Sequence, residues 1–429
     1  MKSSKSAVLL SIGIAAVAIA ACRPALRVVL AADGPASAPT TRASQPAATA
    51  VGWRGDGTGL FPDANPPTVW EADKKTGILW SVKVGKGTYS SPIVVGDKVF
   101  VAAEPDLIIC LDAATGKKLW EKATTFKDLP KAVEEAPGPR DTGNVASTPA
   151  SDGKCVYMTF GNSIVTCFDL DGNRKWIGYV EDPCPTEHGR STSPVICGDK
   201  LVATMNCLRA FDAKTGKEVW KNEKIGECYG TPATAKVDGQ DVIVAASGQV
   251  VRASDGTLLA KGLGSLTYAS PFVVNGVIYG TDVTAYAGKL PDKIAEPLKI
   301  KKLWEQDLEG EFFSSGAAYD GLFYAVSNQG RLFVLDASDG KIVYQKALEI
   351  PNASGAPGMP PGNVYPSISV AGKLLFVSND QGDTLVIQPG KEYKELAHNH
   401  LNDGHAGMPF FAGKRIYVRG DEKLFCLGQ

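Results

Sequence analysis

The chain has 429 residues, 44% of them hydrophobic, and its 45 Lys and Arg side chains nearly balance its 46 Asp and Glu side chains. This balance leaves no basic field of the kind that attracts phosphate backbones, so nucleic acid is not expected as a partner. The length allows two or three domains, but one closed array of repeats can also contain it.

The beginning of the chain resembles an export signal. Lys2 and Lys5 precede an apolar run over residues 7–21, which is too short to cross a bilayer with ease. The run ends in Ile-Ala-Ala-Cys, which resembles the lipobox of bacterial lipoproteins, so Cys22 is the expected lipid attachment site. The alternative is ordinary signal cleavage near Ala32, because apolar character resumes just before that residue.

Residues 23–52 are rich in Ala, Pro, Ser and Thr and show no apolar period, which is typical of a flexible tether. A coil of about twenty such residues spans on the order of 25 Å. We therefore expect an exported protein that is periplasmic or attached to the membrane by its lipid anchor only, since two acyl chains hold such an anchor stably.

From residue 53 onward, short apolar runs alternate with turn residues, and one phrase recurs. Residues 110–120 read C-L-D-A-A-T-G-K-K-L-W, and residues 210–220 read A-F-D-A-K-T-G-K-E-V-W. Self-similar β-rich units at a period of about 35 to 45 residues predict a toroidal array in which no unit buries its apolar face alone.

The phrase also suggests how the units pack. Asp and Gly suit a tight hairpin, because Asp can accept bonds from the turn amides and Gly tolerates positive φ. The Trp falls on the last strand, where its ring can fill the wedge between two twisted sheets and bury about 150 to 250 Å². The residues expected to dock the blades are Trp80, Asp112, Gly116, Trp120, Trp176, Asp212, Gly216, Trp220, Trp304, Asp336 and Tyr344.

Ser-Pro or Thr-Pro pairs mark the starts of inner strands, and with weaker copies the count reaches eight, at Ser91, Thr148, Ser193, Thr231, Ser270, Ser315, Pro366 and Met408. The last unit lacks an outer strand, whereas residues 69–85 supply an outer strand without a unit. We predict an all-β, eight-bladed propeller of four-stranded antiparallel blades, closed by the N-terminal strand. Seven blades would require discarding the weak copy at residues 230–262.

The recurring phrase, Ala-x-Asp-x-x-Thr-Gly-Lys-x-x-Trp, resembles the docking motif of pyrroloquinoline-quinone-like (PQQ-like) β-propeller repeat proteins. Residues 210–220 match it throughout, residues 110–120 differ only by Cys for Ala, and residues 334–344 keep its Asp, Gly and Lys but end in Tyr. With the opening W-R-G-D-G-T-G, the resemblance covers residues 53–429.

The resemblance implies one of two functions. One branch of the family holds quinone-dependent alcohol or sugar dehydrogenases, which often carry a vicinal Cys-Cys ring and need carboxylate and amide ligands for calcium. The other branch holds catalytically silent propellers, including the scaffold lipoprotein of the outer-membrane β-barrel assembly machinery. The chain has no Cys-Cys and no motif that selects calcium ligands, so we expect neither catalytic residues nor a cofactor. PQQ with calcium is the alternative.

The nine cysteines are expected to be mainly structural. Cys110, Cys167 and Cys426 share one phase at the end of a third strand, where small buried residues belong. The better candidates for a disulfide are Cys184, Cys207 and Cys228, and their pairing is left open.

Connections from each outer strand to the next inner strand gather on one face of a propeller, around the mouth of its channel. The four histidines are assigned to such connections. The candidate binding residues of this face are Arg140, Asn144, His188, Arg190, Glu311 and His405. His398, His400, His405 and Asp403 could together bind zinc or copper, but their loose spacing also suits a hydrated loop, so no metal is expected.

These observations favour a non-catalytic, exported, monomeric propeller that binds an envelope protein or peptide as a scaffold. A PQQ-dependent dehydrogenase is the first alternative. Carbohydrate binding is the second, because the aromatic residues Tyr89, Tyr229, Tyr268 and Phe313 precede inner strands, although these side chains could equally pack the channel.

Overall fold

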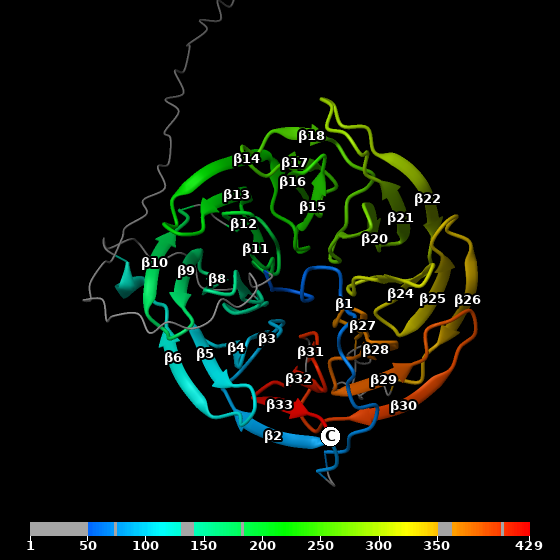
Figure 1. The fold of residues 1–429 in the computed structure, drawn as a ribbon, viewed down its shortest axis with the longest axis horizontal. Coiled ribbons are helices and arrows are strands. Elements are labelled where there is room, and N and C mark those ends of the chain that lie inside the picture. The colour runs from blue at the N-terminus through cyan, green and yellow to red at the C-terminus, as the bar shows by residue number, and fades with distance from the viewer. Residues whose placement is uncertain (1–49, 73–74, 130–140, 182–183, 351–362, 405–406) are drawn as a thin grey trace, which may run out of the picture.

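The computed structural model describes residues 50–429, apart from residues 73–74, 130–140, 182–183, 351–362 and 405–406. Eight sheets surround a central axis, as Figure 1 shows in the view down the shortest axis of the molecule. The predicted all-β propeller with eight blades is confirmed. The described residues include one 3-10 turn, η1 (Phe126–Asp128), and no helix long and apolar enough to span a bilayer.

From the inner strand outward, the first four blades contain β3 (Ile93–Val95), β4 (Lys98–Ala103), β5 (Leu107–Asp112) and β6 (Lys118–Ala123); β7 (Ala150–Ser151), β8 (Cys155–Thr159), β9 (Ile164–Asp169) and β10 (Arg174–Tyr179); β11 (Val195–Cys197), β12 (Lys200–Met205), β13 (Cys207–Asp212) and β14 (Glu218–Gly226); and β15 (Ala233–Val237), β16 (Gln240–Val244), β17 (Val250–Arg252) and β18 (Leu258–Ala260). The next three contain β19 (Phe272–Val274), β20 (Val277–Gly280), β21 (Thr284–Lys289) and β22 (Lys301–Asp307); β23 (Ala317–Tyr319), β24 (Leu322–Val326), β25 (Arg331–Asp336) and β26 (Ile342–Ala347); and β27 (Ser369–Ala371), β28 (Leu374–Ser378), β29 (Asp383–Ile387) and β30 (Glu395–His400).

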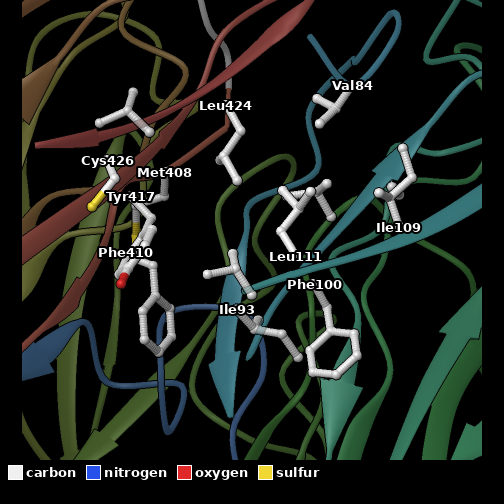
Figure 2. Packing of buried hydrophobic residues seen from close by; sticks show 14 of the residues in the cluster. Val84, Ile93, Phe100, Ile109, Leu111, Met408, Phe410, Tyr417, Leu424 and Cys426 are labelled. Atoms are coloured by element: carbon white, nitrogen blue, oxygen red, sulfur yellow. The ribbon is translucent and has the colours of Figure 1, made fainter. Parts of the chain in front are cut away.

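The eighth blade closes the ring. It combines β31 (Phe410–Ala412), β32 (Arg415–Arg419) and β33 (Lys423–Leu427) with the N-terminal strand β2 (Ile78–Lys83), which pairs antiparallel with β33. Figure 2 shows the core between this blade and the first one, where Phe410, Tyr417 and Leu424 lie across from Phe100 and Leu111. Because β2 shares a sheet with the last three strands, the ring of blades is closed.

Neighbouring blades are joined by a recurring tryptophan contact. Trp176 on β10 is fully buried, and its indole Nε1 donates a 2.9 Å hydrogen bond to the carbonyl of Ala213 in the next blade. Its ring lies over Gly216, where a Cβ atom would be 2.5 Å from the indole. The same contact occurs at four other junctions, made by Trp80, Trp120, Trp220 and Trp304.

In three blades a cysteine on the third strand lies opposite the docking ring. Cys110 pairs with Trp120, Cys167 with Trp176, and Cys426 with Trp80. Burial raises the pKa of the Cys110 thiol to about 12 and that of the Cys426 thiol to about 11, so both are protonated at neutral pH. These thiols act as small packing groups.

The Asp of the phrase organises the turn beneath the ring. Asp112 Oδ1 accepts bonds from the backbone amide and the hydroxyl of Thr115, at 2.8 and 2.7 Å. These bonds, above all the one from the Thr115 hydroxyl, hold the pKa of Asp112 below its ordinary value. Asp212 binds Thr215 in the same way, and Asp336 binds Ser338.

Candidate functional site

The segment before the propeller crosses the centre of the ring, and a cavity of about 220 Å³ remains between it and the inner strands β7, β11 and β15. Val51 forms a bridge with Ser151, Trp53 lies on the wall of the central cavity, and β1 (Leu60–Phe61) pairs parallel with β27. Figure 1 shows this blue segment inside the ring, beside the inner strands. We call residues 51–61 the plug.

A buried arginine fixes the plug in place. The Arg54 side chain is 1% exposed, and its Nη2 donates to the carbonyl oxygens of Gly316, at 2.6 Å, and Ile368, at 3.2 Å. Its guanidinium also lies over the ring of Phe272, 5.1 Å from the centroid. Burial lowers the pKa of Arg54 to about 9, which still leaves the group charged at neutral pH. Because Gly59 packs directly on the guanidinium, a side chain there would displace it.

Above the plug, hydroxyl groups link the inner strands into a nearly closed ring. The backbone amide of Ser91 donates to Thr148 Oγ1 at 3.0 Å, and the amide of Thr148 donates in turn to Ser193 Oγ at 2.9 Å. The pattern continues from blade to blade through Thr231, Ser270, Ser315 and Ser367, and the amide of Met408 returns to Ser91 Oγ. Met408 has no hydroxyl, so the ring is open at one junction.

This ring explains the Ser-Pro and Thr-Pro pairs. The hydroxyl accepts the amide of the preceding blade, and the proline that follows has no amide of its own to satisfy. Sequence reasoning used the pairs only to mark strand starts. Their periodicity was the signal that could have identified them as links between blades.

The hydroxyl ring lines a cavity of about 390 Å³ at the channel mouth. Its wall is an arc of aromatic rings contributed by residues two positions before the hydroxyls. Phe313 stacks on Tyr365 with centroids 4.9 Å apart, Tyr268 meets Phe313 edge-on at 4.9 Å, and Tyr229 stacks on Tyr268 at 5.4 Å. Tyr89 extends the arc through an edge contact with Tyr365. We call these five residues the aromatic collar.

At the second and third blades the collar positions hold Ala146 and Ser191, so the wall is lower there. His188 and Asp141 fill this side, with His188 Nδ1 3.1 Å from Asp141 Oδ2 and its ring 5.8 Å from that of Tyr229. Among the described residues, those lining the cavity include aromatic, hydroxyl and carboxylate groups but no Lys or Arg side chain.

Carboxylates surround the collar and act on its phenols. Burial is the main cause of the raised pKa of Tyr268 and Tyr89, and nearby negative charges add to it, Glu311 for Tyr268 and Asp380 for Tyr89. Burial, with Tyr89 and Asp380, raises the pKa of Tyr365 to about 12. The phenols of Tyr89, Tyr268 and Tyr365 are therefore neutral at physiological pH, and carboxylates lie near them.

The predicted residues of the binding face have different positions. His188 lines the cavity, and Glu311 lies two residues before Phe313, where its carboxylate accepts a 3.1 Å bond from Asn328 Nδ2. Arg140 and His405 lie outside the described residues. Of the six candidates, His188 and Glu311 thus lie at the mouth in the described part of the chain.

Asn144 and Arg190 are buried and hold loops together. Asn144 Nδ2 donates to the carbonyl of Pro105 at 2.6 Å, and its Oδ1 accepts from the amide of Asn162. Arg190 forms two bonds with Glu227, at 2.6 and 3.0 Å, and both of these side chains are almost fully buried. Burial and pairing leave them unavailable to a ligand.

Two of the four histidines are not in a connection, contrary to our assignment. His398 and His400 lie on β30, the outer strand of the seventh blade, and both approach Asp383, at 3.5 and 2.9 Å. Asp403 lies elsewhere and accepts the amides of Asp421 and Lys423. No group of three or more metal-type side chains with suitable geometry occurs among the residues the structure describes.

The three cysteines considered for a disulfide lie in different surroundings. Cys207 is buried on β13, whereas Cys184 and Cys228 lie outside strands at half-buried positions. Cys22 and the preceding signal-like run lie outside the described residues, as does the tether up to residue 49.

The wall of the cavity does not suit PQQ. A tricarboxylate needs cationic or amide donors, and calcium needs several oxygen ligands with net negative charge. In the described part of the lining there is no Lys or Arg side chain, and Asp141 is the single carboxylate, too few oxygen ligands for calcium. We therefore derive no chemistry through this group.

Comparison with known proteins assigns the fold to a family. The sequence model described as outer membrane protein assembly factor BamB matches residues 67–251 and 301–388, well over half of the chain. The chain belongs to this family. BamB of Burkholderia pseudomallei (strain K96243) is 26% identical over 355 residues, which cover 81% of this chain and 75% of that protein. BamB of Moranella endobia (strain PCIT) is 24% identical over 256 residues, which cover 59% of this chain and about half, 53%, of that protein.

Solved structures agree on the architecture. BamB from Moraxella catarrhalis superposes with a TM-score of 0.54 at 11% identity, covering 82% of this chain and 98% of that one. The computationally designed Ika8 protein gives a TM-score of 0.53 at 13% identity, covering 81% and 99%. At these identities the likeness concerns the fold alone. The plug lies outside the residues that the BamB family model matches.

Proposed function

We propose that this BamB-family propeller is a non-catalytic scaffold that binds a protein or peptide in the cell envelope through the mouth that carries the aromatic collar. The observation that carries the proposal is the cavity of about 390 Å³ that is floored by the hydroxyl ring and walled by the five side chains of the aromatic collar. Concave sites with aromatic walls and a few polar groups are typical of recognition surfaces.

Family membership supports the same role. The relatives named above are outer membrane protein assembly factors, a description that fits a scaffold for other proteins. The proposal places the chain outside the cytoplasm, exported by its N-terminal run and attached to a membrane through Cys22 by the part of the predicted tether that precedes the plug. It requires no cofactor and no metal, and it treats the propeller as a monomer.

Affinity purification from solubilised envelopes tests the proposal. The full-length chain should recover one protein in stoichiometric amount, and the variant Tyr268→Ala should recover much less of it. Tyr393→Ala is the matched control, because Tyr393 lies between β29 and β30, away from the cavity lining. Repeated recovery of the propeller alone, or equal recovery by Tyr268→Ala and wild type, would contradict the proposal.

A further inference from the structure

The cavity can hold a single long side chain in an extended conformation. Its volume of about 390 Å³ is at the lower end of the range of ligand sites, which is roughly 300 to 1,000 Å³. The entrance is bordered by rings, and the floor by seven Ser and Thr hydroxyl groups that each accept an amide on one side. A ligand with an apolar stem and a polar head would match a cavity that has aromatic rings at its entrance and polar groups further in.

The charges around the collar favour a cationic head. Asp141 lies in the lining itself. Asp282 Oδ2 accepts the amide of Thr267 at 2.9 Å, immediately before Tyr268 in the chain. Asp380 Oδ1 accepts the amide of Asn363 at 3.0 Å, and Asn363 in turn contacts the hydroxyl of Tyr365. With Glu311, carboxylates therefore lie beside the collar on several sides of the mouth.

Among the described residues that line the cavity there is no Lys or Arg side chain, and the one basic group is the imidazole of His188 beside Asp141. Lysine and arginine are attracted both by carboxylates and by the faces of Tyr and Phe rings, and a partly desolvated site strengthens both effects. A neutral or acidic head would gain neither.

Arg54 limits how deep such a cation can enter. Its Nη2 donates to the carbonyl oxygen of Gly316, which follows Ser315 directly and precedes the inner strand β23. A second cation is therefore repelled from the floor and is held at the level of the collar, near Asp141 and Glu311.

We propose that the cavity takes a lysine or arginine side chain from an extended basic segment of the partner, with the stem against the aromatic collar and the head among the carboxylates. This inference rests on the proposed scaffold function and specifies the chemistry of the bound segment. Nothing covalent is involved.

Fluorescence anisotropy with labelled peptides tests the inference. The probe is a fluorescein-labelled peptide in which serine alternates with lysine, compared with peptides in which glutamine or glutamate replaces lysine. The full-length chain should bind the lysine peptide at least tenfold more tightly than the glutamine peptide, and the affinity should fall with added salt. Equal affinity for the lysine and glutamine peptides would overturn the inference.

Variants distinguish binding of the lysine peptide in the cavity from its nonspecific electrostatic attraction to the protein. Glu311→Gln and Phe313→Ala should each weaken binding of the lysine peptide severalfold, whereas Glu305→Gln on the outer strand β22 should leave it unchanged. If Phe313→Ala does not fold, Tyr268→Leu replaces it, with far-UV circular dichroism as the check. Unchanged binding by the mouth variants would contradict the inference. If the protein captures an envelope protein in the affinity purification but shows no preference for basic peptides, the inference is refuted and the scaffold function is not. If it captures no envelope protein, the scaffold function is refuted.

Discussion

Replacing Trp176 and Gly216 singly and together tests how the blades are joined. Trp176 is fully buried and donates to Ala213, so Trp176→Ala should lower the free energy of unfolding by about 3 to 5 kcal/mol. Gly216 has φ +69° and lies under the indole, where an added Cβ would come within 2.5 Å of the ring. Gly216→Ala should therefore cost about 1 to 2 kcal/mol of left-handed strain and a further 1 to 3 kcal/mol of overpacking.

The two losses should not add. Without the indole, the alanine at position 216 meets no ring, so only the backbone strain remains. The loss of unfolding free energy in the double variant should therefore be smaller than the sum of the two single losses by roughly 1 to 3 kcal/mol. The matched control is Gly239→Ala, which has φ +74° and nothing within 4 Å of an added Cβ. Combined with Trp176→Ala, it should be additive within about 0.5 kcal/mol.

Urea denaturation followed by far-UV circular dichroism compares the wild type with all of these variants under one set of conditions. Additive losses for Trp176 and Gly216 would refute the docking contact between the indole and the glycine. A coupling energy as large for Gly239 as for Gly216 would refute it in the same way, since Gly239 has no contact with the indole.

Three further predictions concern the turns, the hydroxyl ring and the plug. Bonds from Thr115 hold the pKa of Asp112 below its ordinary 3.8, so the stabilisation that the ionised Asp112 provides is complete above pH 3.8 and is lost as the pH falls through the lower folded pKa. Asp112→Asn should therefore lower the unfolding temperature at pH 7 but not in strong acid. An equal loss at both pH values would contradict this prediction. Ser193→Ala leaves the buried amide of Thr148 without an acceptor and should cost about 1 to 3 kcal/mol in urea denaturation, whereas a neutral result would mean that another group or water replaces the hydroxyl. Arg54→Ala removes the bonds that hold the plug and should cost on the order of 3 kcal/mol and speed proteolysis within residues 51–59; unchanged cleavage would show that β1 alone retains the plug.

The architecture was largely predictable because local, repeated sequence patterns determine it. The Asp-x-x-Thr-Gly turn and the Trp that follows occupy one hairpin, so their spacing survives in the sequence. The closing strand could be inferred from a count alone, since the last unit lacked one strand and the N-terminus supplied it. Weak copies such as residues 230–262 could be identified by their position in the repeat. Strands β15 to β18 form there without a docking Trp.

The site was predictable only in part. Tyr89, Tyr229, Tyr268 and Phe313 were noticed because they precede strand starts, but Tyr365 was missed in a weaker copy. Arg54 binds carbonyl groups 262 and 314 positions away, and no local pattern reports such contacts. The burial of Asn144 and Arg190 depends equally on distant partners.

His398 and His400 were misplaced for a different reason. The outer strand β30 reads Glu-Leu-Ala-His-Asn-His, and most of its side chains are exposed. Its one buried side chain is the polar Asn399, so the strand lacks the apolar alternation that identifies a half-buried strand. A polar outer strand therefore resembles a loop in sequence. Pairing with β29 determines its conformation.

Site-specific photo-cross-linking in native envelopes tests the central claim most directly. A photoreactive phenylalanine analogue at position 313, within the aromatic collar, should cross-link one partner protein through a basic segment, identified by mass spectrometry of the linked peptides. The same analogue at position 393 should give no such product. Cross-links from position 393 but not from position 313 would contradict recognition at the channel mouth.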